Sequence, residues 1–274
     1  MKRLSLGAWL ALALIANGVG GVVWLALKVR NDERRAAMRV DHGDTVTIEY
    51  NLDDPHDFTP DERAAIADEA RRAFPAVRSA LPQAPASIVL NVTSAPPDKV
   101  LPETGEAAYI IPPNIVTWRV DTRRKEGVVA IVRTQLRPLL FHETHNLVRS
   151  ADIAPRQDIR EKVVCEGLAT AFERDYGLGG AAPLWGQYPV DVEVWAREVL
   201  ALPKDAPTDV WMRRHPDGRR WLGIRVGTFL ADCATRASGK TSAELASVPA
   251  ETVLAMCPAV AALRDAGAPG LPNP

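Results

Sequence analysis

The sequence predicts an α+β fold in which helices dominate, preceded by an N-terminal segment that spans a membrane. Residues 44–50 and 87–92 alternate apolar and polar side chains and are rich in β-branched residues, which is typical of strands. Longer segments with helix-start signals make up most of the remaining chain. The 274 residues divide into four parts, namely an anchor at 1–30, a linker at 31–43, a domain at 44–258 and a tail at 259–274.

The predicted anchor is apolar from residue 4 to residue 27 apart from Ser5 and Asn17. A spanning helix needs about 20 apolar residues, whereas the apolar region of a cleaved signal peptide has only about 7–15. We therefore expect a retained, single-pass helix with the lipid bilayer as its partner. More basic residues follow this helix than precede it, which favours a cytoplasmic domain. The short Lys2-Arg3 leader resembles an export signal, and we expect the periplasmic side.

The charge of the chain bears on its partners, and its cysteines bear on its compartment. The formal net charge is -1 and both signs are mixed along the chain, so nothing indicates a nucleic-acid partner. Cys233 and Cys257 could form a disulfide in an oxidising compartment and leave Cys165 free. Three reduced thiols would suit a cytoplasmic domain equally well, so the cysteines leave the compartment open.

The first half of the domain alternates strands with one helix. Thr59 has the character of an N-cap and Pro60 that of a first helical residue, which together predict a helix start. Pro75 is expected to end or kink this helix, and if the helix continues past the kink, Pro82 and Pro85 are expected to stop it. Residues 107–120 form a third extended region, which is interrupted by a Pro-Pro pair.

The second half is predicted to be helical. One helix covers about 126–149, with a bend at Pro138, and a second covers about 157–176. A third spans about 221–236, beyond a stretch rich in tryptophan and proline. A short fourth helix is expected after residues 241–244, which have the form of a capping box.

The first predicted helix carries an incomplete metal motif. In a His-Glu-x-x-His helix, residues four apart lie about 40° apart around the axis, so two imidazoles face one metal. Here His142 and Glu143 are present, but Asn146 occupies the position of the second histidine. Its carbonyl is a weaker zinc ligand than imidazole. His145 lies three residues after His142, and side chains at that spacing also share metals, so both remain candidate ligands.

Glu166 on the second helix is the candidate third ligand. If the turn between the helices centres near Ala154, residues 142 and 166 are each twelve positions from it and lie at the same level of an antiparallel pair. Two histidines and a glutamate with an open fourth position form a known catalytic zinc arrangement. Glu161 is a weaker competitor. The same residues are also compatible with a buried, hydrogen-bonded His142 and a surface acid. The expected apolar contacts between the helices are Leu136, Leu140 and Leu147 with Val164, Leu168 and Phe172.

Over residues 45–257 the chain resembles the bacterial family of predicted Zn-dependent proteases known as domain of unknown function 2268. The resemblance is carried by residues 139–149, 165–169, 221–227 and 241–251. The family helix reads His-Glu-x-His-His and then x-x-Arg, so the second zinc ligand of the family is replaced in this chain. A tyrosine that is usual in the third motif is also replaced, by isoleucine.

This resemblance implies a zincin-like metalloprotease domain with a small sheet and a metal-binding helix pair, anchored in the bacterial inner membrane. Zn²⁺ would be held by His142, Glu166 and either Asn146 or His145. Glu143 would be the general base for a metal-activated water that hydrolyses a peptide or protein substrate. The alternative is a catalytically degenerate pseudoprotease that acts as a membrane-tethered binding module. A harder metal than zinc is a third interpretation, because the donor set is rich in oxygen.

Overall fold

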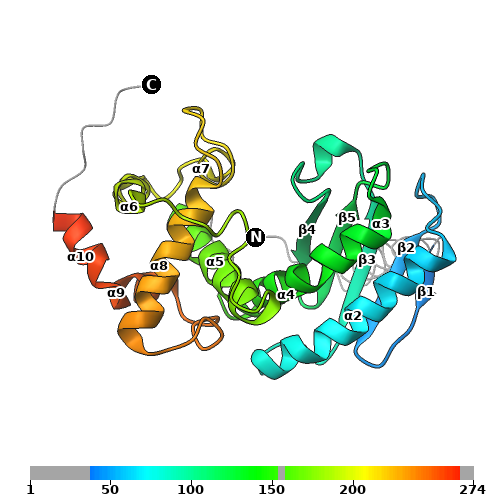
Figure 1. Ribbon diagram of the computed structural model, residues 1–274. Coiled ribbons are helices and arrows are strands. Elements are labelled where there is room, and N and C mark those ends of the chain that lie inside the picture. The colour runs from blue at the N-terminus through cyan, green and yellow to red at the C-terminus, as the bar shows by residue number, and fades with distance from the viewer. Residues whose placement is uncertain (1–37, 154–157, 266–274) are drawn as a thin grey trace, which may run out of the picture.

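The computed structural model describes residues 38–153 and 158–265, which form an α+β structure rich in helices, as predicted (Figure 1). The predicted membrane span at residues 4–27 lies outside the described residues. Within the described ranges, no helix is long and apolar enough to cross a bilayer.

The sheet has five strands in the order β1-β2-β3-β5-β4. The central pairs β2–β3 and β3–β5 are parallel, and the edge strands β1 and β4 are antiparallel to their neighbours. The strands are β1 Met38–Asp41, β2 Val46–Asn51, β3 Ile88–Ser94, β4 Glu106–Ile111 and β5 Ile115–Val120, with a 3-10 turn at Pro97–Lys99 after β3. The Pro112-Pro113 pair makes the hairpin between β4 and β5 and has a cis peptide bond.

Strand β1 corrects the predicted linker at 31–43. Residues 38–41 belong to the sheet, because the β1 backbone pairs with β2, with Met38 opposite Asn51 and Asp41 opposite Ile48. This strand is short and mostly exposed, so it lacks the apolar alternation by which the sequence reveals the other strands.

Helix α2 (Pro60–Ala80) begins as predicted, because Thr59 and Glu62 exchange the two hydrogen bonds of a capping box. It continues past Pro75 to Ala80, just before Pro82, which is the second of the two ends that the sequence allows. A proline inside a helix removes one backbone hydrogen bond. Burial offsets this loss, since Phe74 and Val77 on either side of Pro75 are fully buried.

The predicted helix at 126–149 is divided into three segments. They are α3 (Gly127–Ile131), a π-helical turn η2 (Val132–Leu136) and α4 (Arg137–Asp152). The wider π turn lies directly before Pro138, whose nitrogen cannot donate a helical hydrogen bond. The predicted bend at this proline is therefore a local change of helix type.

The remaining helices form the other half of the molecule (Figure 1). They are α5 Ile159–Phe172, the π-helical turn η3 Glu173–Gly177, α6 Val192–Ala201, α7 Thr208–Met212, α8 Leu222–Ser238, α9 Ala250–Met256 and α10 Pro258–Asp265. Helices α6 and α7 occupy the stretch rich in tryptophan and proline, where the sequence predicts no helix. Residues Thr241 and Glu244 make the predicted capping contacts, but turns follow instead of a helix. Helix α10 begins at the last residue of the predicted domain and continues into the predicted tail.

Helices α5 and α8 cross in close contact at two glycines. A Cβ atom added at Gly167 would collide with the backbone of Gly227, and one at Gly227 would collide with the carbonyl oxygen of Val163. These two glycines belong to two separate sequence motifs, 165–169 and 221–227. The fold therefore explains both glycines by the same close approach of two helices.

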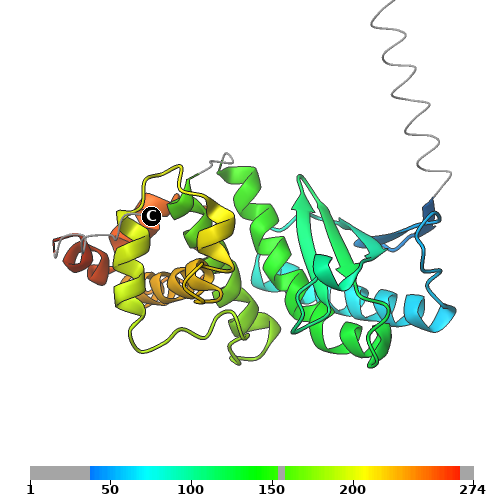
Figure 2. The same ribbon diagram turned by 90° about the horizontal axis from the view of Figure 1, so that it is seen from above.

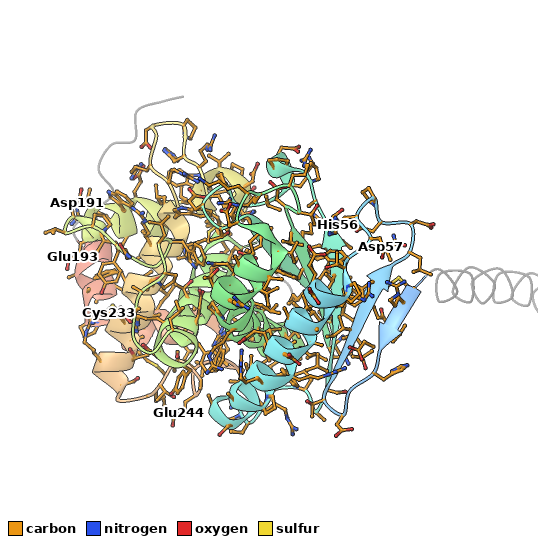
Figure 3. All side chains as sticks on the ribbon, turned by 45° about the vertical axis from the view of Figure 1, so that its right-hand side comes forward. His56, Asp57, Asp191, Glu193, Cys233 and Glu244 are labelled. Atoms are coloured by element: carbon orange, nitrogen blue, oxygen red, sulfur yellow. A yellow bond between two sulfur atoms is a disulfide. The ribbon has the colours of Figure 1, made fainter. Side chains whose placement is uncertain are left out.

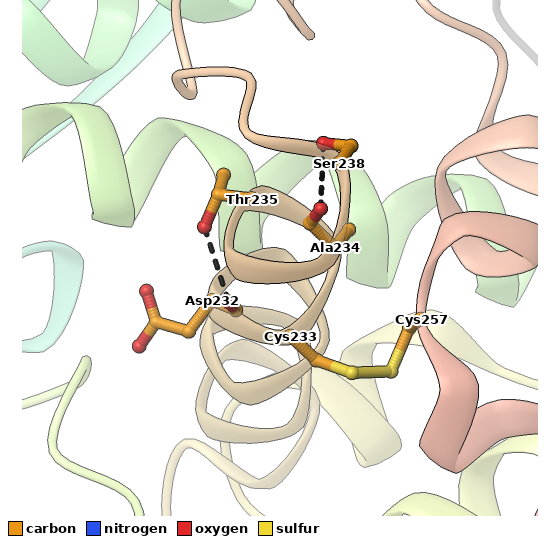
Figure 4. The surroundings of a disulfide bond; sticks show 6 residues. All are labelled: Asp232, Cys233, Ala234, Thr235, Ser238 and Cys257. Atoms are coloured by element: carbon orange, nitrogen blue, oxygen red, sulfur yellow. Dashed lines mark hydrogen bonds between the residues drawn. A yellow bond between two sulfur atoms is a disulfide. The ribbon is translucent and has the colours of Figure 1, made fainter.

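A disulfide joins Cys233 on α8 to Cys257 at the end of α9 (Figure 4). Of the two pairing states that the sequence leaves open, the structure has the oxidised one, and Cys165 is the free cysteine. The disulfide fixes the C-terminal helices to α8.

Two apolar cores lie on either side of α4. One joins the sheet to α2 and α4, and the other joins α5, α6, α8 and α9. Figure 2 shows the sheet and the later helices on opposite sides of α4. In Figure 3, His56 and Asp57 mark the sheet end of the molecule, and Asp191 and Glu193 mark the helical end. The predicted metal helix is thus at the junction of the two cores.

Candidate active site

The predicted hairpin of α4 and α5 brings His142 and Glu166 together. Nε2 of His142 lies 3.3 Å from Oε2 of Glu166. The two side chains are therefore at the same level, as their equal distance from the turn predicts. All six predicted apolar positions are buried, but they divide between the two cores, with Val164 and Leu168 in the core of the later helices and the other four in the core of the sheet, α2 and α4.

The other nitrogen of His142 faces a second carboxylate. Nδ1 lies 3.0 Å from Oε2 of Glu173, which also accepts a hydrogen bond of 3.3 Å from Nε1 of Trp185. Sequence reasoning missed Glu173. Its signal was available, because Glu173 follows Glu166 by seven residues, or about two helical turns.

Both ring nitrogens of His142 thus face carboxylate oxygens. A neutral imidazole has one N–H and can donate to only one of them. Burial lowers the pKa of His142, but the contacts with Glu166 and Glu173 outweigh burial and raise this pKa well above its ordinary value. Either a proton on Nε2 or a metal ion in its place satisfies the contact with Glu166.

Glu166 is held in its ionised form. Its second oxygen, Oε1, accepts a hydrogen bond of 2.6 Å from Nζ of Lys162, one helical turn earlier. Burial would raise the pKa of Glu166, but Lys162 and His142 together lower it below its usual range. An ionised carboxylate beside an imidazole nitrogen is the form that binds a metal ion.

Glu143 lies where two cavities meet. One cavity, here called the aromatic cavity, is lined by His142, Glu173, Trp185 and Trp221, and the other, the basic cavity, by Arg149 and Lys162. Glu143 and Glu166 line both. Burial raises the pKa of Glu143, so its carboxyl is a better proton acceptor than an exposed glutamate. The predicted general base is therefore placed next to the predicted ligands.

Asn146 lines the basic cavity together with Glu143 and Glu166. Its Oδ1 accepts a hydrogen bond of 3.3 Å from Sγ of Cys165. Burial raises the pKa of that thiol to about 12, so Cys165 remains protonated and able to donate. The amide oxygen of Asn146, the predicted replacement ligand, is thus engaged by a neighbouring thiol.

His145 points away from this group. Its Nε2 lies 3.1 Å from the carbonyl oxygen of Ser242, and its ring packs against Phe172. The side chain is completely buried, which lowers its pKa to about 3 and keeps it neutral. The described residues that line the two cavities do not include His145. Of the two candidates for the missing ligand, the structure places only Asn146 beside the site.

Arg149 joins α4 to α5 and to the segment before α9 through hydrogen bonds. Its Nε donates to Oε1 of Glu161 at 2.8 Å, and its Nη1 donates to the carbonyl oxygens of Ala246 and Val248. Glu161 in turn accepts a hydrogen bond from the backbone nitrogen of Ala250. Glu161, the weaker candidate ligand, therefore ties α4 and α5 to the segment before α9.

The donors fit part of a zinc site. With zinc–ligand distances of about 2.0–2.2 Å and tetrahedral angles, an imidazole nitrogen and a carboxylate oxygen lie about 3.3 Å apart, as Nε2 of His142 and Oε2 of Glu166 do. A carboxylate on the other ring nitrogen, as supplied by Glu173, is the usual support of a metal-binding histidine. The site lacks a third strong zinc ligand among the described residues. In the described ranges, no three His, Cys, Asp or Glu side chains are grouped to hold a metal ion.

The sequence was compared with protein-family models and with curated proteins, and neither comparison gives a match. The resemblance to predicted Zn-dependent proteases therefore rests on the motifs quoted above and stays a prediction.

Proposed function

We propose that this protein is a membrane-anchored zinc-dependent metallopeptidase of the zincin-like type. The observation that carries the proposal is the pair formed by His142 and Glu166, at the spacing of two zinc ligands and with Glu143 on the same helix. Zinc, when bound, would lower the pKa of a water molecule and polarise the peptide carbonyl. Asn146 is the proposed third ligand, through its amide oxygen.

The chain's own residues have distinct tasks in this proposal. Glu143 accepts a proton and later donates it to the leaving amine. Glu173 accepts the Nδ1 hydrogen of His142 and so directs Nε2 towards Glu166. Lys162 keeps Glu166 ionised.

An edge strand borders the site and suits an extended peptide. Strand β4 is at the end of the sheet, and its residue Ala108 lines both cavities. An extended substrate can add to such an edge through backbone hydrogen bonds. This arrangement supports a peptide or protein as the substrate.

The proposed location is the periplasmic side of a bacterial inner membrane, with the segment at residues 4–27 as the anchor. The Cys233–Cys257 disulfide supports this side, because disulfides persist in oxidising compartments and are rare in the cytosol.

The test is chelator-sensitive cleavage of an unstructured protein such as casein, with Glu143→Gln as the variant. We expect the purified protein to cleave it, a chelator to stop cleavage, and Glu143→Gln to lower the rate about 100-fold or more. Glu126→Gln is a matched control, since Glu126 pairs with Arg124 at an exposed position and is not among the residues that line either cavity. Equal activity of the native protein and Glu143→Gln would contradict the proposal.

The alternative, a pseudoprotease that binds partners without cleaving them, is supported by one observation. The thiol of Cys165 donates to the amide oxygen of Asn146, so the replacement ligand already has a partner. A stable fold with little metal, indifferent to chelator, is the expected result under this alternative.

A further inference from the structure

Glu106 is a buried acid that the sequence did not single out. It is the first residue of β4, and its side chain is only 4 % exposed. Oε1 of Glu106 accepts a hydrogen bond of 3.1 Å from the hydroxyl of Thr104. The carboxyl lines the aromatic cavity together with His142 and Glu143.

Glu106 has no basic partner in residues 38–153 and 158–265. Of the other acids that line the aromatic cavity, Glu166 contacts Lys162 and Glu173 contacts His142, whereas Glu143, the proposed general base, also forms no ion pair in the described ranges. Burial, together with Glu143 and Glu173, raises the pKa of Glu106 to about 7. A buried carboxyl without a cation costs stability, and such groups are found where a ligand uses them.

Apolar side chains form part of the lining of the aromatic cavity. Its walls include Leu101, Trp185, Trp221 and Ile224. Lysine and arginine side chains pack an apolar stem along such walls and carry their charge at the end. The cavity thus combines apolar walls with the carboxyl of Glu106, which forms no ion pair in the described residues, and this combination complements such a side chain.

We propose that Glu106 determines specificity, by pairing with a lysine or arginine side chain of a peptide held at the site next to the bond to be cleaved. This inference rests on the proposed peptidase function and names its substrate class. Glu106 would contact the substrate but not the reacting atoms.

Arg213 is the arginine that lines the aromatic cavity together with Glu106. No ion pair between Arg213 and Glu106 is formed, and Arg213 is exposed and lines the basic cavity as well. Arg213 therefore lies where the two cavities adjoin and is open to solvent, whereas the side chain of Glu106 is buried. A substrate cation can reach Glu106 without displacing a salt bridge.

The first test measures binding by titration calorimetry and requires no catalysis. The probes are Nα-acetyl-lysine amide and its neutral counterpart Nα-acetyl-norleucine amide, added to the full-length protein. We expect the lysine probe to bind about tenfold or more tightly, because hydrogen bonds to charged groups contribute about 1.5–3 kcal/mol. Glu106→Gln should remove this preference and leave the norleucine affinity unchanged.

Glu103→Gln is the matched control. Glu103 lies on the same connection, pairs with Arg220 and is not among the residues that line the aromatic cavity. This variant should keep the preference for the lysine probe. Equal affinity for the two probes in the native protein, or a preference that survives Glu106→Gln, would overturn the inference. Tighter binding of Nα-acetyl-glutamate amide would also overturn it and point to Arg213.

Cleavage separates this inference from the proposed function. Two peptides that differ only in lysine against norleucine should be cleaved by the native protein with kcat/KM values at least about tenfold apart, and Glu106→Gln should equalise them. If the native protein cleaves neither peptide but still binds the lysine probe more tightly than the norleucine probe, the peptidase proposal alone is overturned. Cleavage that ignores the lysine would overturn the role of Glu106 alone.

Discussion

His142 and His145 lie three residues apart on α4 and have opposite surroundings. His142 has a carboxylate at each ring nitrogen and lines the aromatic cavity. His145 is completely buried, donates to one backbone carbonyl and packs against Phe172. Burial keeps His145 neutral, whereas two carboxylates favour the charged form of His142.

The side chains of α4 therefore serve two different ends. His142 collects acids around a cavity, which costs stability and suits a ligand or a metal. His145 and Arg149 hold the segment around residues 242–248 through its backbone carbonyls, which stabilises the fold. A histidine in a metal-like motif is thus assigned by its contacts and not by its spacing.

The largest expected effect is on the free energy of unfolding, when the contacts of Arg149 are removed. Arg149→Met should lower the free energy of unfolding by about 3–5 kcal/mol, because it leaves Glu161 and two backbone carbonyls without their partner. Urea unfolding followed by circular dichroism measures this loss. Arg39→Met is the control, since Arg39 pairs with Asp57 and both side chains are exposed, and it should cost less than about 1 kcal/mol. Similar losses in both variants would break the comparison.

A smaller effect, of opposite sign, is expected at Glu106 on the site side. The pKa of this carboxyl is about 7 in the folded protein and 4.5 in the unfolded chain. The folded protein therefore favours the protonated form of Glu106. The contribution of this carboxyl to the free energy of unfolding is complete below pH 4.5 and is lost as the pH rises to about 7. Above that pH the loss approaches about 3 kcal/mol.

Glu106→Gln should remove this loss. We expect the variant to be more stable than the native protein at pH 8 and similar to it near pH 4.5, as measured by urea unfolding at both values. Glu103→Gln, in which the exchanged acid pairs with Arg220, should not show this gain. A stability difference between native protein and Glu106→Gln that does not change with pH would contradict the account of Glu106.

The smallest effect separates the two histidines directly. His145→Ala should cost about 1–3 kcal/mol, because the Ser242 carbonyl loses its donor and a cavity forms beside Phe172. It should leave zinc binding unchanged. Loss of zinc in His145→Ala, in a protein that is still folded by circular dichroism, would return His145 to the set of ligands.

The sequence predicted the elements that local patterns specify. The helix start at Thr59 and Pro60 follows from local residue types, and the paired levels of His142 and Glu166 follow from helical spacing. The short strand β1 did not follow, because it is defined by backbone pairing with β2 rather than by an apolar pattern.

The candidate site was predicted only in part, for a related reason. Glu106 and Trp185 reach the cavity from a strand and a loop far along the chain, and no spacing rule connects them to His142. The spacing of residues on the helix could not predict the direction of the His145 side chain either, since this direction depends on Ser242, which is 97 residues away in sequence. Tertiary contacts decide which side chains of a motif face the site.

The most direct test of the central claim is the zinc content of the protein, purified without added metal, alongside His142→Ala and Asn146→His. The account predicts close to one zinc per chain in the native protein, none in His142→Ala, and tighter retention in Asn146→His, because imidazole is the better ligand. Zinc in Asn146→His alone would contradict it and show a degenerate site on an intact fold, as in a pseudoprotease.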